Sequence, residues 1–139
     1  MLTLEQFKAA RATLQGVIRT TSLIHSPALS KACGNQVYLK PENMQVTGAY
    51  KIRGAYYKIS TLSEEEKARG LITASAGNHA QGLAYAAQAA GVPATIVMPT
   101  TTPLVKVNNT KDYGARVILH GEVFDEAAEK AAQLAEEEG

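Results

Sequence analysis

A regular alternation of short apolar runs and helical segments occupies the second half of this 139-residue chain. The apolar runs, which are predicted as strands, cover residues 71–74, 94–98 and 115–119. Each is followed by a predicted helix. Residues 78–90 and 124–138 carry small or apolar residues at helical spacing, and residues 103–113 lie between a helix start signal and Gly114. Strands that alternate with helices lie parallel, and continuous apolar strands are typical of a sheet covered on both faces. The sequence therefore predicts an α/β fold, an open parallel sheet of three to four strands in a three-layer αβα arrangement.

The residues before position 71 are less regular. Helices are predicted over residues 4–16, after Pro27, over residues 50–60 and from Ser63 to Gly70, and a strand over residues 37–40. The other residues of this part are predicted to be irregular. Thr3 and Ser63 each begin a capping box, in which a side chain three residues later closes the helix start. Further along, Thr102 is the expected N-cap of a helix with Pro103 at its first position.

The composition excludes several classes of protein. Hydrophobic residues make up 45% of the chain and charged residues 19%, which is typical of a globular domain. The net charge of +1 argues against a nucleic-acid-binding surface. No stretch approaches the ~20 apolar residues of a membrane span, and the first residues do not resemble a signal peptide. The single cysteine, Cys33, excludes an internal disulfide and a multi-cysteine metal site. We therefore expect a cytoplasmic protein without a nucleic-acid or membrane partner.

The segment Thr47–Ala55 carries the first chemical signal. Lys51 falls in the first turn of a predicted helix, where the positive end of the helix dipole disfavours an ammonium ion. The like charge of Arg53 and any burial of the amine would act in the same direction. A neutral amine is what Schiff-base chemistry needs, and Gly48 and Gly54 let a flat ligand or other backbone come close. Lysines near helix starts are also common on surfaces, so these residues alone leave both interpretations open.

The second signal, Thr73–Gly82, lies between the end of a predicted strand and the start of a helix. Backbone N–H groups at such a start bind anions, carboxylates included. Open parallel sheets bind ligands at this place, outside the carboxyl ends of their strands. Asn78 can donate and accept hydrogen bonds, so it can hold a phenolic oxygen. An ordinary loop, with Ser75 or Asn78 as the helix cap, is the alternative.

Together the two segments resemble the serine/threonine dehydratases, pyridoxal-phosphate (PLP) enzymes of the tryptophan-synthase-β-like class, or fold type II. Glu42 and Thr47–Ala55 match the segment to which this family attaches its cofactor, with Tyr50 where phenylalanine is commoner. Ser75–His79 matches the family's asparagine loop. The resemblance extends across nearly the whole chain, so it implies part of a type II PLP-enzyme fold.

The resemblance also implies roles for the site residues. Lys51 would carry PLP as a Schiff base and act as acid and base at the substrate Cα. Asn78 would hydrogen-bond the 3′ oxygen of the cofactor, and Tyr50 would flank the cofactor. The substrate carboxylate would be held by Ser75, Gly77, Asn78 and His79. The implied reaction removes the Cα proton and the β-hydroxyl group of L-threonine or L-serine and ends in a 2-oxo acid and ammonia.

Two positions narrow the choice within the class. Ile52 follows the lysine where the synthases of cysteine and threonine usually have an aspartate. Serine racemases resemble the chain closely, but they carry a second serine just before the loop glycine as the acid and base on the other face of the substrate. Ala76 stands at this position and has no proton to give. Elimination is therefore favoured, and a serine racemase or a related ammonia-lyase is the alternative.

Part of the cofactor site is expected outside these 139 residues. The family holds the phosphate with a glycine-rich loop and places a serine or similar group against the pyridine nitrogen, and neither is found here. The helix at 124–138 also ends the chain where a further strand is expected. We therefore expect an N-terminal portion of an enzyme. Residues 1–50 would belong to its larger PLP domain, and residues 51–139 would form the smaller α/β domain.

The expected partners follow from this division. They are a small amino-acid substrate, the C-terminal remainder of the enzyme and further copies of the chain in a homo-oligomer. Without the remainder the chain is expected to be inactive. A non-catalytic α/β module that folds alone and contacts other proteins is the alternative from another functional class.

Overall fold

The computed structural model describes all residues 1–139. Its helices are α1 (Leu4–Thr13), α2 (Pro27–Cys33), the 3-10 helix η1 (Glu42–Met44), α3 (Lys51–Ser60), α4 (Glu64–Arg69), α5 (Asn78–Ala90), α6 (Leu104–Asp112) and α7 (Phe124–Glu138). Its strands are β1 (Ile24–His25), β2 (Tyr38–Leu39), β3 (Leu71–Ala74), β4 (Ala94–Met98) and β5 (Arg116–Leu119). None of the helices is both long and apolar enough to cross a membrane.

The three strands of the second half form one parallel sheet in the order β3–β4–β5. The register places Leu71 beside Ala94 and Thr95 beside Arg116, so the carboxyl ends of all the strands meet at one edge. The open parallel sheet that the sequence predicts is confirmed, with three strands.

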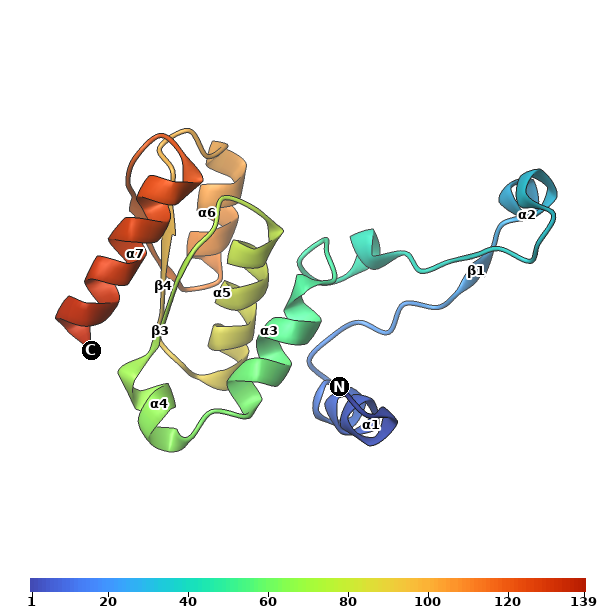
Figure 1. Ribbon diagram of the computed structural model, residues 1–139, viewed down its shortest axis with the longest axis horizontal. Coiled ribbons are helices and arrows are strands. Elements are labelled where there is room, and N and C mark those ends of the chain that lie inside the picture. Colours follow the sequence, from blue (N-terminus) through green and yellow to red (C-terminus); the bar gives the residue numbers. More distant parts are fainter.

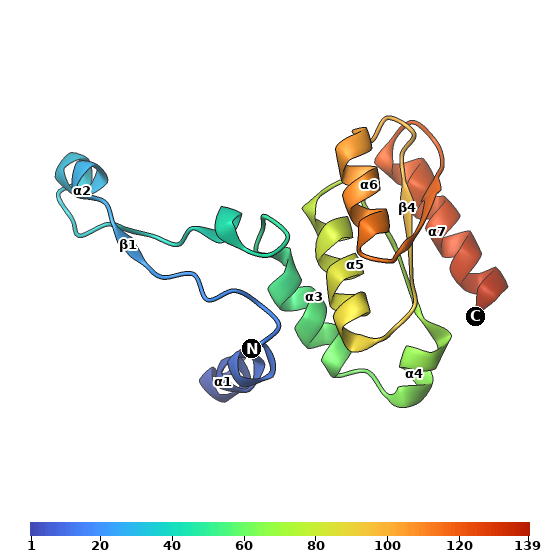
Figure 2. The same cartoon turned by 180° about the vertical axis from the view of Figure 1, so that it is seen from behind.

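Helices cover both faces of this sheet (Figure 1, Figure 2). On one face α5 and α6 enclose the cluster Ala80, Ala84, Ile96, Met98, Val107 and Ala115. On the other face α7 contributes to the cluster Val97, Ala127, Ala131 and Leu134. Successive side chains of a strand point to opposite faces, so Ile96 and Met98 enter one core and Val97 the other. This is why β4 ends in the continuous apolar run Ile96–Met98, and the predicted three-layer arrangement is confirmed.

Helix α3 lies against α5 in a further contact on the same side of the sheet (Figure 2). Ala55 and Ile59 of α3 join Ala86 and Ala87 of α5 in a buried cluster. Small side chains at such a contact reduce the distance between helix axes. Because Lys51 is the first residue of α3, this packing sets the place of the predicted cofactor lysine relative to α5.

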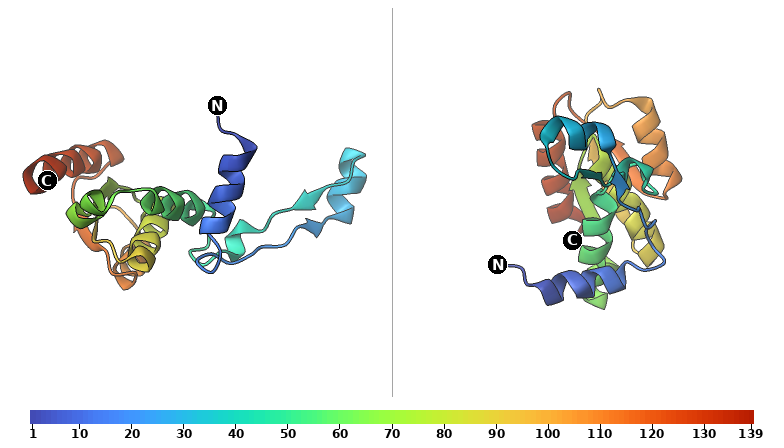
Figure 3. Two further views of the ribbon diagram at one scale, coloured as in Figure 1. Left: turned by 90° about the horizontal axis from the view of Figure 1, so that it is seen from below. Right: turned by 90° about the vertical axis from the view of Figure 1, so that its right-hand side faces the viewer.

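The residues before α3 form α1 and an extended arm (Figure 1, Figure 3). In the arm β1 and β2 pair antiparallel, with Ile24 opposite Leu39, and α2 connects them at the far end. The prediction of irregular structure is wrong at β1, because a strand of 2 residues carries no alternating pattern. Helix α1 ends at Thr13, earlier than the predicted residue 16, because Gly16 with φ 80° already lies in the following turn.

The start of α6 also differs from the prediction. Thr102 does not cap this helix, because its Oγ1 is buried and has no hydrogen-bond partner. Pro103 is extended, with ψ 132°, and its carbonyl accepts from the N–H of Lys106. Pro103 is therefore the N-cap and Leu104 the first helical residue. The fixed φ of proline suits both positions, so the sequence pattern did not distinguish them.

Candidate active site

The predicted carboxylate loop lies at the carboxyl edge of the parallel sheet. Ser75 directly follows β3, and its N–H donates to the carbonyl of Val97 at 3.0 Å. Gly77 is the N-cap of α5, and Asn78 and His79 begin the helix. The N–H groups of a first helical turn have no acceptor within the helix. The structure thus gathers the predicted carboxylate ligands at the edge where open parallel sheets bind ligands.

Ser75 shapes this loop through its side chain. Its buried Oγ accepts from the N–H of Gly77 at 3.3 Å and from the N–H of Ala80 at 3.2 Å. The side chain therefore does the work of a cap for α5, which is the alternative that the sequence left open. A hydroxyl that accepts twice still has its own proton to donate. Capping by Ser75 is therefore compatible with donation to a ligand.

Substitution of Ser75 tests whether its side chain both caps α5 and shapes the loop that contains His79. We expect Ser75→Ala to lower the free energy of unfolding by about 1 kcal/mol, as the loss of a helix cap does. Denaturant titration of the chain measures the change. Ser63→Ala is a matched control, because it removes a cap at which Oγ accepts from the N–H of Glu66 at 3.2 Å, at the start of α4. Both variants should lose stability, but only Ser75→Ala should change the NMR signals of His79. Unchanged stability in Ser75→Ala would contradict the capping role.

The predicted cofactor lysine begins α3. Tyr50 is the N-cap residue, and Lys51 Nζ lies 5.2 Å from the centroid of the Tyr50 ring. A cation within about 6 Å of an aromatic face is attracted to it. Both residues are exposed, so the burial considered from the sequence does not act on Lys51 in this chain. The amine is instead open to a reagent from solution.

Lys51 also lies close to the carboxylate loop. Partial burial lowers the pKa of His79 from its ordinary value of 6.5, and the positive charge of Lys51 lowers it further. The backbone of Lys51 packs on α5, because a Cβ built on Gly82 would lie 3.2 Å from the Cβ of Lys51. The two signals that are well separated in the sequence are therefore neighbours in the fold, with Tyr50 beside them.

An ion pair that the sequence did not reveal joins the arm to α3. Arg53 donates from Nε and Nη2 to the two carboxylate oxygens of Glu42, each at 2.8 Å. The hydroxyl of Thr21 donates to the same carboxylate at 2.6 Å. The hydrogen bonds from Arg53 are the largest cause that lowers the pKa of Glu42 from 4.5 to about 2. Arg53 is thus paired with an opposite charge and is not the free like charge beside Lys51 that the sequence suggests.

Gln45 is a second residue that the sequence did not single out. Its buried side chain accepts from the N–H of Arg19 at 2.7 Å and donates to the carbonyl of Arg19 at 2.8 Å. The same oxygen accepts from the N–H of Val46 at 3.0 Å. One amide thus pairs with the backbone of a distant segment and holds the turn that leads to Lys51. No periodic pattern marks such a contact, because both segments are irregular.

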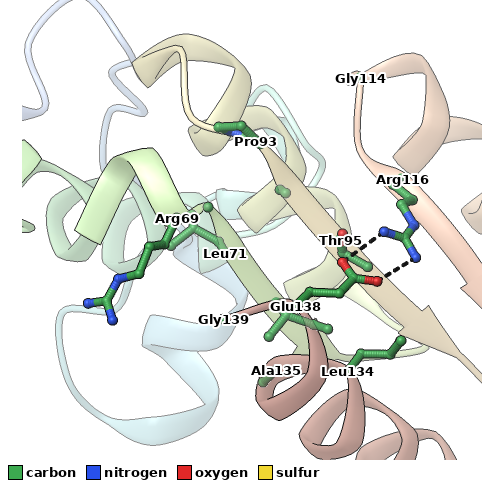
Figure 4. Close-up of a pocket in the computed structure, with 13 residues that line it drawn as sticks. Arg69, Leu71, Pro93, Thr95, Gly114, Arg116, Leu134, Ala135, Glu138 and Gly139 are labelled. Atoms are coloured by element: carbon green, nitrogen blue, oxygen red, sulfur yellow. Dashed lines mark hydrogen bonds and ion pairs between the residues drawn. The ribbon is translucent and has the colours of Figure 1, made fainter. Parts of the chain in front are cut away.

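A separate cavity of about 380 Å³ opens at the amino edge of the sheet (Figure 4). Leu71, Thr95 and Arg116 line it from the beginnings of the three strands. Arg116 forms a bidentate ion pair with Glu138 of α7, with both N–O distances at 2.9 Å (Figure 4). Lys51 and the loop after β3 do not line this cavity. It is therefore distinct from the predicted site.

The sequence profile of the family described as "Pyridoxal-phosphate dependent enzyme" matches residues 14–139. The chain belongs to this family. L-threonine ammonia-lyase of Thermotoga maritima is 55% identical over 139 residues, which are 100% of this chain and 35% of that protein. The chain therefore spans about a third of the length of this relative.

Solved structures share the fold. The structure of maize serine racemase has a TM-score of 0.90 at 33% identity, and the match covers 98% of this chain and 41% of that one. The processed form of threonine deaminase isoform 2 from Solanum lycopersicum has a TM-score of 0.84 at 39% identity, covering 99% and 42%. The predicted type II fold is confirmed, and PLP is the cofactor of the family, as the sequence indicated.

The residues of the site suit this cofactor. Lys51 offers an exposed primary amine and Tyr50 an aromatic ring beside it. Asn78 is exposed at the start of α5 and carries an amide that can hold a ring oxygen. A Cβ built on Gly77 would meet no atom within 4 Å, so the space in front of the loop is open. These groups fit the aldehyde and ring-oxygen side of PLP.

Proposed function

We propose that the protein of which this chain forms part deaminates L-threonine and L-serine with PLP, and that the chain supplies the cofactor lysine and the carboxylate loop. The observation that carries the proposal is the contact of Lys51 with α5 at Gly82, because α5 begins with Asn78 and His79 of that loop at the carboxyl edge of the sheet. The similarity to a threonine ammonia-lyase over the whole chain supports the choice of substrate.

In this proposal the loop from Ser75 to His79 binds the substrate carboxylate. The N–H groups at the start of α5 and the hydroxyl proton of Ser75 donate to it, and the helix dipole stabilises its negative charge. The low pKa of His79 keeps the ring neutral near pH 7, so it adds a hydrogen-bonding group without a second charge. Asn78 holds the ring oxygen of the cofactor and thereby orients the ring.

Lys51 has two tasks in the proposed reaction. It would attach the cofactor covalently in the resting enzyme, and once the substrate amine has displaced it, the freed Lys51 amine would take the proton from the substrate Cα. When bound, PLP would supply the electron sink for this proton transfer. Threonine loses the Cα proton and the β-hydroxyl group as one water molecule. The enamine that results tautomerises to an imine, to which water adds with loss of ammonia, so the net products are 2-oxobutanoate and ammonia.

We further propose that residues 1–50 belong to the larger domain and residues 51–139 form the smaller one. The parallel sheet and its helices all lie in residues 51–139. Most of the large apolar side chains that are exposed, such as Phe7 and Leu23, lie in residues 1–50. Apolar surface of this kind marks a face that another part of a protein covers, which supports the division at residue 50.

Assays on the full-length protein and on this chain test the proposed function. The full-length protein, saturated with PLP, should form 2-oxobutanoate from L-threonine and pyruvate from L-serine. The chain alone should form neither, because the phosphate and pyridine nitrogen of the cofactor have no partners among the proposed site residues. A full-length protein without 2-oxo acid formation would favour the non-catalytic module. Turnover by the chain alone would contradict its proposed inactivity.

Serine racemisation is the second candidate activity, since the fold matches maize serine racemase with a TM-score of 0.90. Ala76 lies in the loop directly before Gly77 and carries no ionisable or hydroxyl group. A racemase needs a proton donor on each face of the substrate Cα, and Lys51 serves one face. We therefore propose elimination as the main reaction.

The substitution Ala76→Ser tests this choice in the full-length enzyme. A hydroxyl at residue 76 could protonate the face opposite Lys51, so we expect racemisation of L-serine to rise by about tenfold or more relative to elimination. Chiral analysis of the serine recovered after partial reaction measures the ratio. Ala76→Gly is the control, because it changes the loop without adding a hydroxyl group. Recovered serine that stays fully L, with elimination intact, would contradict the prediction.

A further inference from the structure

Helix α5 meets the first turn of α3 at a residue without a side chain. A Cβ built on Gly82 would lie 3.0 Å from the backbone N of Ile52. It would lie 3.2 Å from both the carbonyl carbon and the Cβ of Lys51. Backbone atoms cannot rotate away from such a contact as the end of a long side chain can. A side chain at residue 82 therefore requires the start of α3 to move away from α5 by a few tenths of an ångström.

The helix itself gives no reason for this glycine. Gly82 lies inside α5 and its φ is not in the left-handed region, so alanine would adopt the same backbone. Glycine inside a helix costs about 1 kcal/mol relative to alanine. Glycine at residue 82 therefore makes α5 less stable than alanine would. The close approach of Lys51 and Ile52 is the structural reason for a glycine at this position.

The position of Gly82 along α5 connects this contact with the site. Gly82 follows Asn78 by one helical turn, at i+4, so the two residues share a face of the helix. The backbone of Lys51 rests on that face at Gly82. The start of α3 thus contacts α5 one helical turn after Asn78, close to the loop that precedes α5.

We propose that Gly82 is a positioning residue for Lys51. By lacking a side chain it lets the first turn of α3 rest directly on α5, and this contact sets the distance from Lys51 Nζ to the loop Ser75–His79. The identity of the group with which Lys51 reacts rests on the proposed function, whereas the distance itself does not.

Gly54 is the matched control for Gly82. It is also a helix-interior glycine, in α3, and a Cβ built on it would meet no atom within 4 Å. Gly54→Ala and Gly82→Ala therefore bring the same gain in helix propensity. They differ in the contact with the backbone of Lys51 and Ile52, so the difference between the two variants measures that contact.

The titration of His79 in the 139-residue chain reports the position of Lys51 without any cofactor. The midpoint is followed by NMR in the parent chain, in both glycine variants and in Lys51→Met, and His25 and His120 serve as internal references. In Gly82→Ala the charge of Lys51 is farther away, so the His79 midpoint should rise toward its value in Lys51→Met. In Gly54→Ala it should stay at the parent value.

A second measurement uses PLP as a probe of the amine. The chain is mixed with PLP, reduced with borohydride, and the modified lysines are identified by peptide mass spectrometry. Modification of Lys51 relative to Lys58 should be lower in Gly82→Ala than in the parent, because the added Cβ displaces the backbone that carries the Lys51 amine.

The two measurements distinguish a failure of the proposed role of Lys51 from a failure of the proposed role of Gly82. If Lys51 of the parent is not modified in preference to Lys58, the proposed role of Lys51 fails, and the His79 midpoint still decides the role of Gly82. If Gly82→Ala leaves the His79 midpoint at the parent value, the positioning role of Gly82 is wrong. Overpacking costs about 1–3 kcal/mol, so Gly82→Ala is also made in the stabilised Gly54→Ala background. Failure to fold there too would overturn the inference, because Gly82 would then be required for folding and not for positioning.

Discussion

Lys51→Ala is expected to abolish covalent cofactor binding by the full-length enzyme and to lower threonine turnover by about 10³-fold or more. The variant loses both the amine that attaches PLP and the base at the substrate Cα, and removal of a catalytic base alone typically costs about 10²–10⁴-fold. Reduction of the PLP-loaded protein with borohydride, followed by mass spectrometry, measures the attachment. The rate of 2-oxobutanoate formation measures turnover.

Lys58→Ala is the control for this variant. Lys58 is an exposed residue of the same helix, in its last turn, far from the first turn that carries Lys51. It should leave both the attachment and the turnover unchanged. If Lys51→Ala keeps its attached cofactor, another lysine holds PLP, and Lys40 and Lys58 are the candidates to test next.

Arg53→Met is expected to lower the free energy of unfolding by about 2 kcal/mol. Glu42 is only 17% exposed and Arg53 31%, so the variant leaves a carboxylate largely out of water without its main partner. Removal of one member of a pair in this position costs more than the pair contributes, because the remaining charge keeps its desolvation penalty. Denaturant titration at pH 7 measures the change.

The matched control is Arg116→Met. The pair of Arg116 with Glu138 has the same bidentate geometry, but its side chains are 54% and 48% exposed. Exposed pairs contribute about 0–1 kcal/mol, so this variant should change stability little. Equal losses in the two variants would show that burial does not distinguish the pairs and would contradict the prediction.

The same pair makes stability depend on pH. The pKa of Glu42 is lowered from 4.5 to about 2 in the folded chain. A lowered pKa stabilises the fold above the unfolded value, and this contribution is lost as the pH falls through the folded value. Stability should therefore decline between about pH 4.5 and pH 2, and Arg53→Met should show a weaker decline.

Most of the second half of the chain was predictable from its sequence. The central strand β4 carries the buried residues Ile96, Val97 and Met98, and its neighbours β3 and β5 are short runs that are mostly apolar. Of the helices, α5 and α7 carry small residues at helical spacing. Gly70, Gly91 and Gly114 end helices with positive φ, and that is a local property of each residue. Hydrophobic periodicity, together with the residues that begin and end helices, is sufficient to predict a helix or strand that is long enough to show these patterns.

The first half was less predictable for a physical reason. β1 and β2 have 2 residues each, and the contacts that hold the arm come from single side chains, such as Gln45 and Glu42. Whether Glu42 faces Arg53 depends on the path of the chain between them and not on a periodic pattern. The N-cap of α6 was wrong by one residue because proline suits both positions.

The candidate site was predictable in its residues but not in their arrangement. Lys51 and the loop from Ser75 to His79 were recognised as two separate segments. Their nearness depends on how α3 lies on α5, and this packing involves both the buried cluster of Ala55, Ile59, Ala86 and Ala87 and the glycine at residue 82. A single glycine forms no periodic pattern in the sequence, although the lack of a Cβ at residue 82 directly affects the distance between α3 and α5.

The hydrogen bonds at the base of the arm also connect separate parts of the chain. The side chain of Gln45 hydrogen-bonds the backbone of Arg19, and the carboxylate of Glu42, three residues earlier, pairs with Arg53 of α3. Side chains therefore link the arm both to the segment around Arg19 and to the helix that begins with Lys51. Another part of the protein that binds the tip near α2 is thus connected, through these bonds, to the helix that carries the predicted cofactor lysine.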